Sequence, residues 1–214
     1  MPILLIVAAV SYLLGSIPFG YLLVRLFRGE DVRRSGSGNI GATNVSRKSP
    51  VLGLLTLLLD ALKGTCAVFL ANQVFARTAP KNLDVSWFGL LSLVALCAIL
   101  GHMFPVWLHF RGGKGVATSV GAFAVLLPRA TLGAFVIFVV VALVSRYVSL
   151  ASIMAALSLP IFAWLSLRER GSDGLLTLAP IAIAAALVII KHHENIRRLF
   201  AGTESRFGRK HVEP

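Results

Sequence analysis

Charged residues are scarce in this sequence. Of its 214 residues, 14% are Asp, Glu, Lys or Arg and 57% are hydrophobic, whereas soluble domains carry roughly 25% charged residues. This composition excludes an ordinary water-soluble globular domain. It predicts an all-α integral membrane protein that forms a single polytopic domain over residues 1–214.

Acidic residues and cysteines are also few. The chain has 9 Asp and Glu against 21 Lys and Arg, which gives a formal net charge of +12. No basic soluble fold is evident to bind nucleic acid, so the excess charge indicates positive-inside loops and an anionic substrate or lipid surface. Cys66 and Cys97 both lie in apolar stretches and form no CxxC pair. We therefore expect no disulfide, no metal site and no cofactor.

The N-terminal apolar stretch lacks the basic start of a signal peptide. Its first charged residue is Arg25, which predicts a retained transmembrane helix with the N-terminus outside. The apolar run 116–144 is overlong for one helix. Dividing it at Pro128 places residues 111–118 and the C-terminal tail on one side, the cytoplasmic side by the distribution of Lys and Arg. The sequence thus predicts seven transmembrane helices, several of them short, at about 3–27, 51–75, 87–107, 116–127, 130–144, 148–167 and 175–190.

The longest polar run between two apolar segments covers residues 32–47. Its glycines let the backbone approach an anion closely, its hydroxyls and amides form short-range hydrogen bonds, and its arginines pair well with phosphate. The alternative is a flexible, solvated loop with ordinary positive-inside charges, but the density of specialised residues favours a binding loop. Its candidate binding residues are Gly36, Ser37, Gly38, Asn39, Thr43, Asn44 and Arg47.

A second polar segment, residues 111–118, contains the run Gly112-Gly113-Lys114-Gly115 just before an apolar stretch. The helix before it is broken near its end by Pro105. The GxxxxGK(S/T) spacing of a Walker A loop is missing. The segment nevertheless has the parts of a phosphate cradle, which are bare N–H groups, one ammonium and the start of a helix.

A third polar segment, residues 191–198, follows the last apolar run. If the last helix continues into it, His192 and Asn195 lie three residues apart and share a face. We expect Arg197 and Arg198 to act as a basic anchor beside the membrane.

Ionisable residues also occur within the apolar runs. Asp60 and Lys63 are three residues apart, so they can pair on one helical face. The sequence leaves open whether this pair is a functional site or simply neutralises itself inside the bundle. We expect His102 and His109 to be structural or interfacial.

Three polar segments on one membrane face indicate a phosphate-bearing ligand held beside an apolar interior. Either an enzyme that joins a phosphate ester to an acyl chain or a transporter or channel for a phosphorylated small solute fits this pattern. Transporters often contain internal repeats with broken helices at the bilayer midplane. The two halves of this chain show no convincing repeat, which favours the enzyme.

These segments resemble a known family. Residues 35–47, 112–118 and 192–196 look like the three signature segments of the bacterial acyl-phosphate:glycerol-3-phosphate acyltransferases, the PlsY family, and residues 59–64 and 101–105 also match. The resemblance covers nearly the full chain in order. One departure is Ile40, where the family more often has proline, which alters the rigidity of the loop but no candidate catalytic residue.

The resemblance implies transfer of a fatty acyl group from acyl phosphate to the sn-1 hydroxyl of glycerol 3-phosphate. The products are lysophosphatidic acid, an intermediate of phospholipid biosynthesis, and phosphate. It also implies a bacterial inner-membrane enzyme with its site on the cytoplasmic face, and a possible partner in the enzyme that supplies acyl phosphate. The site residues that it implies are Ser37, Arg47, Lys114, His192 and Asn195, with Gly112, Gly113 and Gly115 beside the glycerol phosphate and Glu194 mainly structural. For Asp60 and Lys63 we also expect a structural role.

The chemistry of these residues agrees with that reaction. An acyl phosphate is already activated, so the enzyme mainly positions two anions and offsets charge in the transition state. His192 is the candidate general base, with a substrate phosphate as the alternative proton acceptor. Ser37 has no base beside it in sequence and is expected to donate a hydrogen bond. None of the five histidines has Asp five positions later, which excludes the HxxxxD acyltransferase design.

Overall fold

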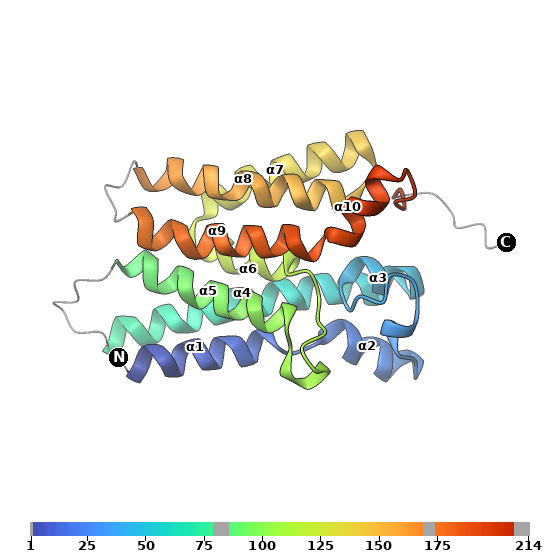
Figure 1. The fold of residues 1–214 in the computed structure, drawn as a ribbon. Coiled ribbons are helices and arrows are strands. Elements are labelled where there is room, and N and C mark those ends of the chain that lie inside the picture. Colours follow the sequence, from blue (N-terminus) through green and yellow to red (C-terminus); the bar gives the residue numbers. More distant parts are fainter. Residues whose placement is uncertain (1, 79–85, 169–173, 208–214) are drawn as a thin grey trace.

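The computed structural model describes residues 2–78, 86–168 and 174–207, and within these ranges every regular element is a helix (Figure 1). This confirms the predicted all-α integral membrane class. The helices are α1 (Pro2–Gly15), α2 (Phe19–Arg28), η1 (Val32–Arg34), α3 (Ala42–Lys48), α4 (Pro50–Thr78), α5 (Trp87–Met103), η2 (Val106–Leu108), α6 (Val116–Leu126), α7 (Pro128–Ser145), α8 (Val148–Arg168), α9 (Gly174–Lys191) and α10 (His193–Phe200).

Five segments of the described chain are long and apolar enough to cross a membrane, or six if the bent pair α9 and α10 counts as one span. Helix α6 is apolar but has only 11 residues. At about 1.5 Å per residue it is too short to cross a hydrocarbon core of roughly 30 Å. The number of seven spans and their orientation therefore remain predictions.

The predicted first span, 3–27, agrees with the apolar segment Pro2–Arg28, but the structure adds a break near its middle that was not predicted. Helix α1 ends at Gly15, and α2 begins at Phe19, directly after Pro18. Proline has no N–H to continue the helical hydrogen bonds, and it disfavours helical geometry in the residue before it. Within the break, the carbonyl of Ile17 accepts hydrogen bonds from the Phe19 N–H at 3.1 Å and from the Lys63 side chain of α4 at 2.8 Å.

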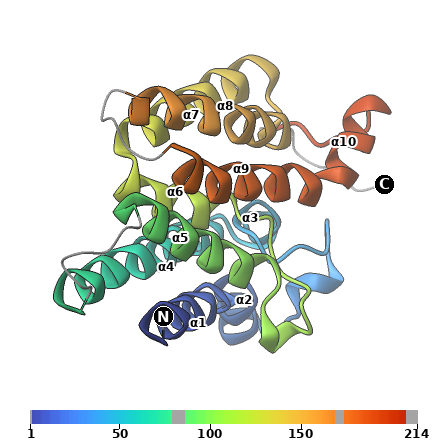
Figure 2. The same ribbon diagram turned by 60° about the vertical axis from the view of Figure 1, so that its left-hand side comes forward.

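The helices pack in layers. Figures 1 and 2 both show α7 and α8 on one side of the bundle, α1 on the other, and α5 and α9 between them. Helices α2, α3 and α10 lie at the right-hand end in Figure 1, opposite the N-terminus. The polar segments therefore gather at one end of an apolar bundle.

Helices α4 and α6 approach so closely that only glycine fits at their contact. A Cβ atom added to Gly64 would overlap the carbonyl oxygen of Thr118, and one added to Gly121 would overlap that of Ala61. Small residues at helix contacts allow such packing in membranes, where burial of apolar surface gives little driving force. This contact fixes the position of the short helix α6.

We predict that Gly121→Val will separate α4 from α6. The added side chain has no space, so the substitution should destabilise the protein by about 1–3 kcal/mol or more. The measurement is the thermal unfolding midpoint of the purified protein in detergent. Gly174→Ala is the control, because the nearest neighbour of a Cβ there is Cδ1 of Leu178 at 4.0 Å. Equal midpoints for the two variants would contradict the assigned role of the α4–α6 contact.

Candidate active site

A cavity of about 850 Å³ opens at the end of the bundle where the polar segments gather. It brings together side chains from the loop before α3, the start of α6, the start of α10 and residues 201–207, which we call the C-terminal strap. Its walls also include apolar side chains from α4, α7 and α8. Its polar lining residues include Ser37, Asn39, Thr43, Asn44, Arg47, Asp60, His102, Lys114, Ser149, His192, Asn195, Arg198, Glu204, Ser205 and Arg206.

The loop before α3 is organised by the buried side chain of Asn44. Its Oδ1 accepts a hydrogen bond from the Ser37 N–H at 2.9 Å, and its Nδ2 donates to the carbonyls of Val32, Ser35 and Asn39 at 2.9–3.1 Å. The amide of Asn44 is thus used to hold the loop in shape. The Asn44 side chain therefore positions Ser37 at the cavity, and its own polar atoms are used within the loop.

Glycines let this loop turn tightly. Gly36 and Gly38 have φ of 58° and 68°, in the left-handed region that glycine adopts without strain. A Cβ atom on Gly36 would overlap Oδ1 of Asn44. Neither glycine is among the residues that line the cavity. Both therefore act on the site by shaping the loop. Thr43 and Arg47, on α3, face the cavity.

The second segment differs from the expected phosphate cradle at Gly112 and Gly113. Their N–H groups are not bare, because they donate to the carbonyls of Met103 and His102 at 3.2 and 3.0 Å. The last carbonyls of a helix have no partner within it and accept such donors. A Cβ on Gly113 would also overlap the His102 ring. These two glycines therefore fasten the turn to the end of α5.

The residues that follow do face the cavity. Gly115 has φ of 83° and precedes α6, and the cavity is lined by Lys114, Gly115, Val116 and Ala117. The first N–H groups of a helix lack intrahelical partners and carry partial positive charge. Lys114 and the start of α6 thus place positive charge on the wall of the cavity.

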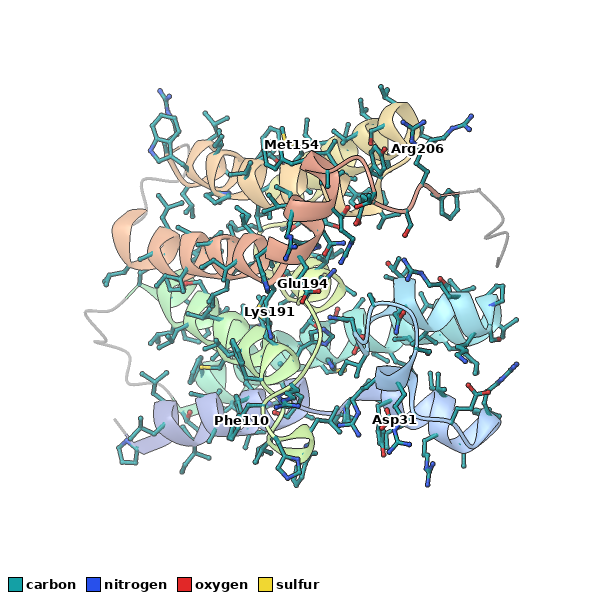
Figure 3. The ribbon with its side chains drawn as sticks, turned by 45° about the vertical axis from the view of Figure 1, so that its right-hand side comes forward. Asp31, Phe110, Met154, Lys191, Glu194 and Arg206 are labelled. Carbon is teal, nitrogen blue, oxygen red and sulfur yellow. The ribbon has the colours of Figure 1, made fainter. Side chains whose placement is uncertain are left out.

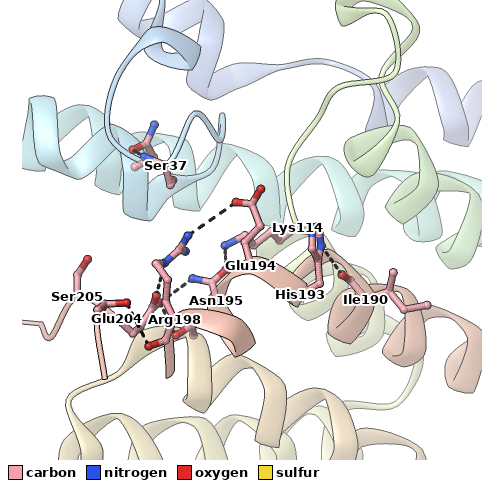
Figure 4. Close-up of polar contacts among 12 residues, drawn as sticks. Ser37, Lys114, Ile190, His193, Glu194, Asn195, Arg198, Glu204 and Ser205 are labelled. Atoms are coloured by element: carbon pink, nitrogen blue, oxygen red, sulfur yellow. Dashed lines mark hydrogen bonds and ion pairs between the residues drawn. The ribbon is translucent and has the colours of Figure 1, made fainter. Parts of the chain in front are cut away.

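The Lys114 ammonium is held from across the cavity. Its Nζ donates a short hydrogen bond to Oδ1 of Asn195 (Figure 4). Burial lowers the pKa of Lys114 to about 8, against an opposing effect of the Glu204 carboxylate. The ammonium is therefore mainly charged at neutral pH and loses its charge in mildly alkaline solution.

The third segment does not continue the last helix in a straight line, so the condition under which His192 and Asn195 would share one helical face is not met. Helix α9 ends at Lys191 and α10 begins at His193, with a bend of 53°. His192 lies at the bend and is buried, and its Nδ1 is 2.7 Å from the carbonyl oxygen of Val188. Since a carbonyl only accepts, Nδ1 carries the proton, and Nε2 is left as the acceptor that a general base needs.

The side chains around Asn195 include residues that sequence reasoning missed. Glu204 accepts hydrogen bonds from Ser149, Asn195 and Arg198 at 2.6, 2.6 and 2.7 Å. These contacts join segments far apart in the chain, and no spacing in the sequence indicates them. Arg198 was expected to be a membrane anchor, but it lines the cavity.

Glu194 differs from its neighbours on α10. Its side chain is 65% exposed and lies 3.8 Å from Arg198, one helical turn away. It is not among the residues that line the cavity. This position suits the structural part expected for it.

The pair of Asp60 and Lys63 lies beneath the cavity. Lys63 Nζ is 2.7 Å from Asp60 Oδ1, and it also donates to the carbonyl of Ile17, in the break between α1 and α2, at 2.8 Å. His102 Nδ1 approaches the same carboxylate oxygen at 3.4 Å. Asp60 and His102 line the inner end of the cavity. His109, by contrast, is exposed and lies outside it.

This arrangement can hold anions next to an acyl chain. Arg47, Lys114 and Arg198 supply positive charge, while Leu57 and Phe138 give the cavity an apolar wall. Among the described residues, no group of three or more His, Cys, Asp or Glu side chains is placed to hold a metal ion.

Comparisons with known proteins agree with this chemistry. The family model described as glycerol-3-phosphate acyltransferase matches residues 5–202. A protein named glycerol-3-phosphate acyltransferase from Agrobacterium fabrum is 46% identical, with 98% of this chain and 95% of that protein covered. Another of that name, from Trichlorobacter lovleyi, is 48% identical, with coverages of 92% and 94%.

Two solved structures are similar as well. One is a crystal structure of PlsY, an integral membrane glycerol 3-phosphate acyltransferase, in the glycerol 3-phosphate form; the TM-score is 0.81 at 39% identity, with 96% of each chain covered. The other is its lysophosphatidic acid form, with a TM-score of 0.79 at 38% identity and coverages of 96% and 95%. With the family model matching nearly its whole length, the chain belongs to the glycerol-3-phosphate acyltransferase family.

Proposed function

We propose that this protein transfers a fatty acyl group from acyl phosphate to the sn-1 hydroxyl of glycerol 3-phosphate. The hydroxyl oxygen bonds to the acyl carbon, the bond from that carbon to the phosphate oxygen breaks, and lysophosphatidic acid and inorganic phosphate are released. The observation that carries the proposal is one cavity with cations at its polar end and apolar side chains in its wall. The similar PlsY structures are named for glycerol 3-phosphate and lysophosphatidic acid forms.

The cationic groups bring two phosphates together. Lys114 and the N-terminus of α6 form one anion site, and Arg47 and Arg198 face the same cavity from α3 and α10. Two substrate anions repel each other, and fixed cations offset that repulsion while they hold the reacting atoms close. Arg47 can also bind an anion through several N–H groups at once.

His192 is the proposed general base. Its protonated Nδ1 is held by the Val188 carbonyl, which leaves Nε2 to take the proton of the glycerol hydroxyl as the new ester bond forms. Ser37 lines the cavity from the opposite loop, and we assign it a hydrogen bond to substrate. Asn195 binds Lys114 rather than a base, so its part is to place that ammonium.

The acyl donor follows from the size and lining of the cavity. A coenzyme A thioester carries a bulky nucleotide, and acyl carrier protein needs a docking surface. In the part of the chain that the structure describes, all regular elements belong to the helical bundle, and the cavity measures about 850 Å³. Phosphate is the leaving group that fits a compact cationic cavity, with the acyl chain against Leu57 and Phe138.

The proposed setting is the bacterial inner membrane, with the cavity on the cytoplasmic face. Arginines and lysines concentrate in the segments at that end of the bundle, as the positive-inside rule requires. A cytoplasmic opening also gives access to glycerol 3-phosphate and to the enzyme that supplies acyl phosphate.

We predict that the purified protein in detergent forms lysophosphatidic acid from glycerol 3-phosphate and a fatty acyl phosphate without nucleotide, metal ion or carrier protein. The measurement is quantification of both products by mass spectrometry and a phosphate assay. Heat-denatured protein gives the background hydrolysis of the donor. Efficient turnover with an acyl thioester and none with acyl phosphate would refute the proposed donor.

We predict that kcat/KM for glycerol 3-phosphate stays level up to about pH 8 and falls as the pH rises further. The reason is the pKa of Lys114, about 8, above which the anion site loses its charge. Arginine stays charged throughout this range. Lys114→Arg should therefore abolish the alkaline fall in whatever activity it keeps, and an unchanged fall in that variant would assign the titration to another group.

We predict that the cavity and the far end of α8 lie on opposite sides of the membrane. In a background without Cys66 and Cys97, Arg168→Cys should react with an impermeant thiol reagent in spheroplasts, whereas Arg34→Cys should react only after lysis. Both residues are exposed. Variants that keep acyltransferase activity are compared, and labelling of position 34 in intact spheroplasts would reverse the proposed orientation.

A further inference from the structure

The C-terminal strap, residues 201–207, returns from α10 across the cavity. The N–H of Phe207 donates to the carbonyl of Arg146 at 2.7 Å, and Arg206 Nε donates to the Tyr147 hydroxyl at 3.0 Å, which ties the strap to the turn between α7 and α8. Figure 3 labels Arg206 beside these helices. From the other side, Arg47 Nη2 donates to Ser205 Oγ at 3.1 Å. These contacts fix the three residues that follow Glu204.

Glu204 brings a negative charge into a cationic cavity. Its side chain is only 8% exposed. Its Oε1 accepts from Ser149 Oγ and from Asn195 Nδ2, both at 2.6 Å, and its Oε2 accepts from Arg198 Nε at 2.7 Å (Figure 4). A buried carboxylate is tolerated only with such partners. The hydrogen bonds outweigh the effect of burial and keep the pKa of Glu204 below its ordinary value, so it is ionised at neutral pH.

This carboxylate sets the orientation of the Asn195 amide. A carboxylate can only accept, so the NH₂ group of Asn195 must face Glu204. The amide oxygen then faces the other way, where it accepts from Lys114 Nζ. Turning the amide over would place oxygen against oxygen on one side and two donors together on the other. The three side chains form a directed chain of hydrogen bonds from Lys114 through Asn195 to Glu204.

Glu204 also acts on Lys114 through its charge. Burial is the main influence that lowers the pKa of Lys114, and the Glu204 carboxylate is the largest influence in the opposite direction. The positive charges of Arg198 and Arg47 lower the pKa of Lys114 further, and the Glu194 carboxylate raises it by less than Glu204 does. The charged and titratable groups around Lys114 are Arg47, His192, Glu194, Arg198 and Glu204.

We propose that Glu204 is a positioning residue for acyl transfer: it fixes the Asn195 amide and so holds the Lys114 ammonium charged and in place at the anion site. Its part in turnover rests on the proposed function of Lys114. Its effect on Lys114 itself does not, and that effect is measurable without any substrate.

The first test measures the titration of Lys114 directly. The full-length protein in detergent is treated with a limiting amount of a small amine-acylating reagent over a range of pH, and modification of the peptide that contains Lys114 is quantified by mass spectrometry. Glu204→Gln removes the charge at nearly constant shape, and the labelling midpoint should move down by about one pH unit. The matched control is Glu30→Gln, which removes a carboxylate paired with Lys48 outside the cavity and should leave the midpoint unchanged.

The second test measures turnover. Glu204→Gln should lower kcat/KM for glycerol 3-phosphate about tenfold or more and move its alkaline fall to lower pH by the same shift as the labelling midpoint. Glu204→Asp keeps the charge on a side chain that is one methylene shorter. Its kcat/KM and the pH of its alkaline fall should therefore lie between those of the parent protein and of Glu204→Gln. It also serves as the test if Glu204→Gln does not fold.

An unchanged labelling midpoint in folded Glu204→Gln overturns the proposal. If only Glu204→Asp folds, an unchanged midpoint together with unchanged turnover in that variant overturns it. A strap that only supports the fold would lower stability without moving the midpoint. A shifted midpoint with unchanged kcat/KM supports the link from Glu204 to Lys114 and instead overturns the part proposed for Lys114 in the reaction.

Discussion

The close packing of α4 against α6 is the constraint on which the site depends. Gly64 and Gly121 let the two helices meet at backbone distance. Helix α6 is too short to reach across a membrane, so this contact decides how deep its first residue lies. As a result, Lys114 and the first residues of α6 line the same cavity as the buried side chains of Asp60 and His102.

Polar groups at such a depth must find partners, and here each partner comes from a different part of the chain. Lys63 donates to the carbonyl of Ile17 in the break between α1 and α2, Lys114 donates to Asn195 on α10, and Arg47 donates to Ser205 in the strap. An unpaired charge in an apolar interior is costly. These contacts therefore hold the polar loops together at one end of the bundle.

Sequence reasoning succeeds where the signal is local. Apolar length and composition predict the helical membrane class, and the spacing of Asp60 and Lys63 predicts a pair that the structure shows at 2.7 Å. It fails where a group depends on a distant partner. The N–H groups of Gly112 and Gly113 are used by α5, and Glu204 joins α8 to α10. No spacing along the chain encodes which distant carbonyl or hydroxyl such a group will meet.

Charge balance explains why fixed partners matter for the proposed reaction. Substrates and products each carry two phosphate groups, so a cavity that simply attracts anions binds both equally well. Uniform binding of that kind changes KM but does not raise kcat. Acceleration must come from cations held where the two phosphates and the reacting hydroxyl meet. A lysine side chain is flexible, and burial lowers its pKa. Asn195 limits the movement of Lys114 and Glu204 opposes the loss of its charge, so a mobile side chain can act as a fixed one.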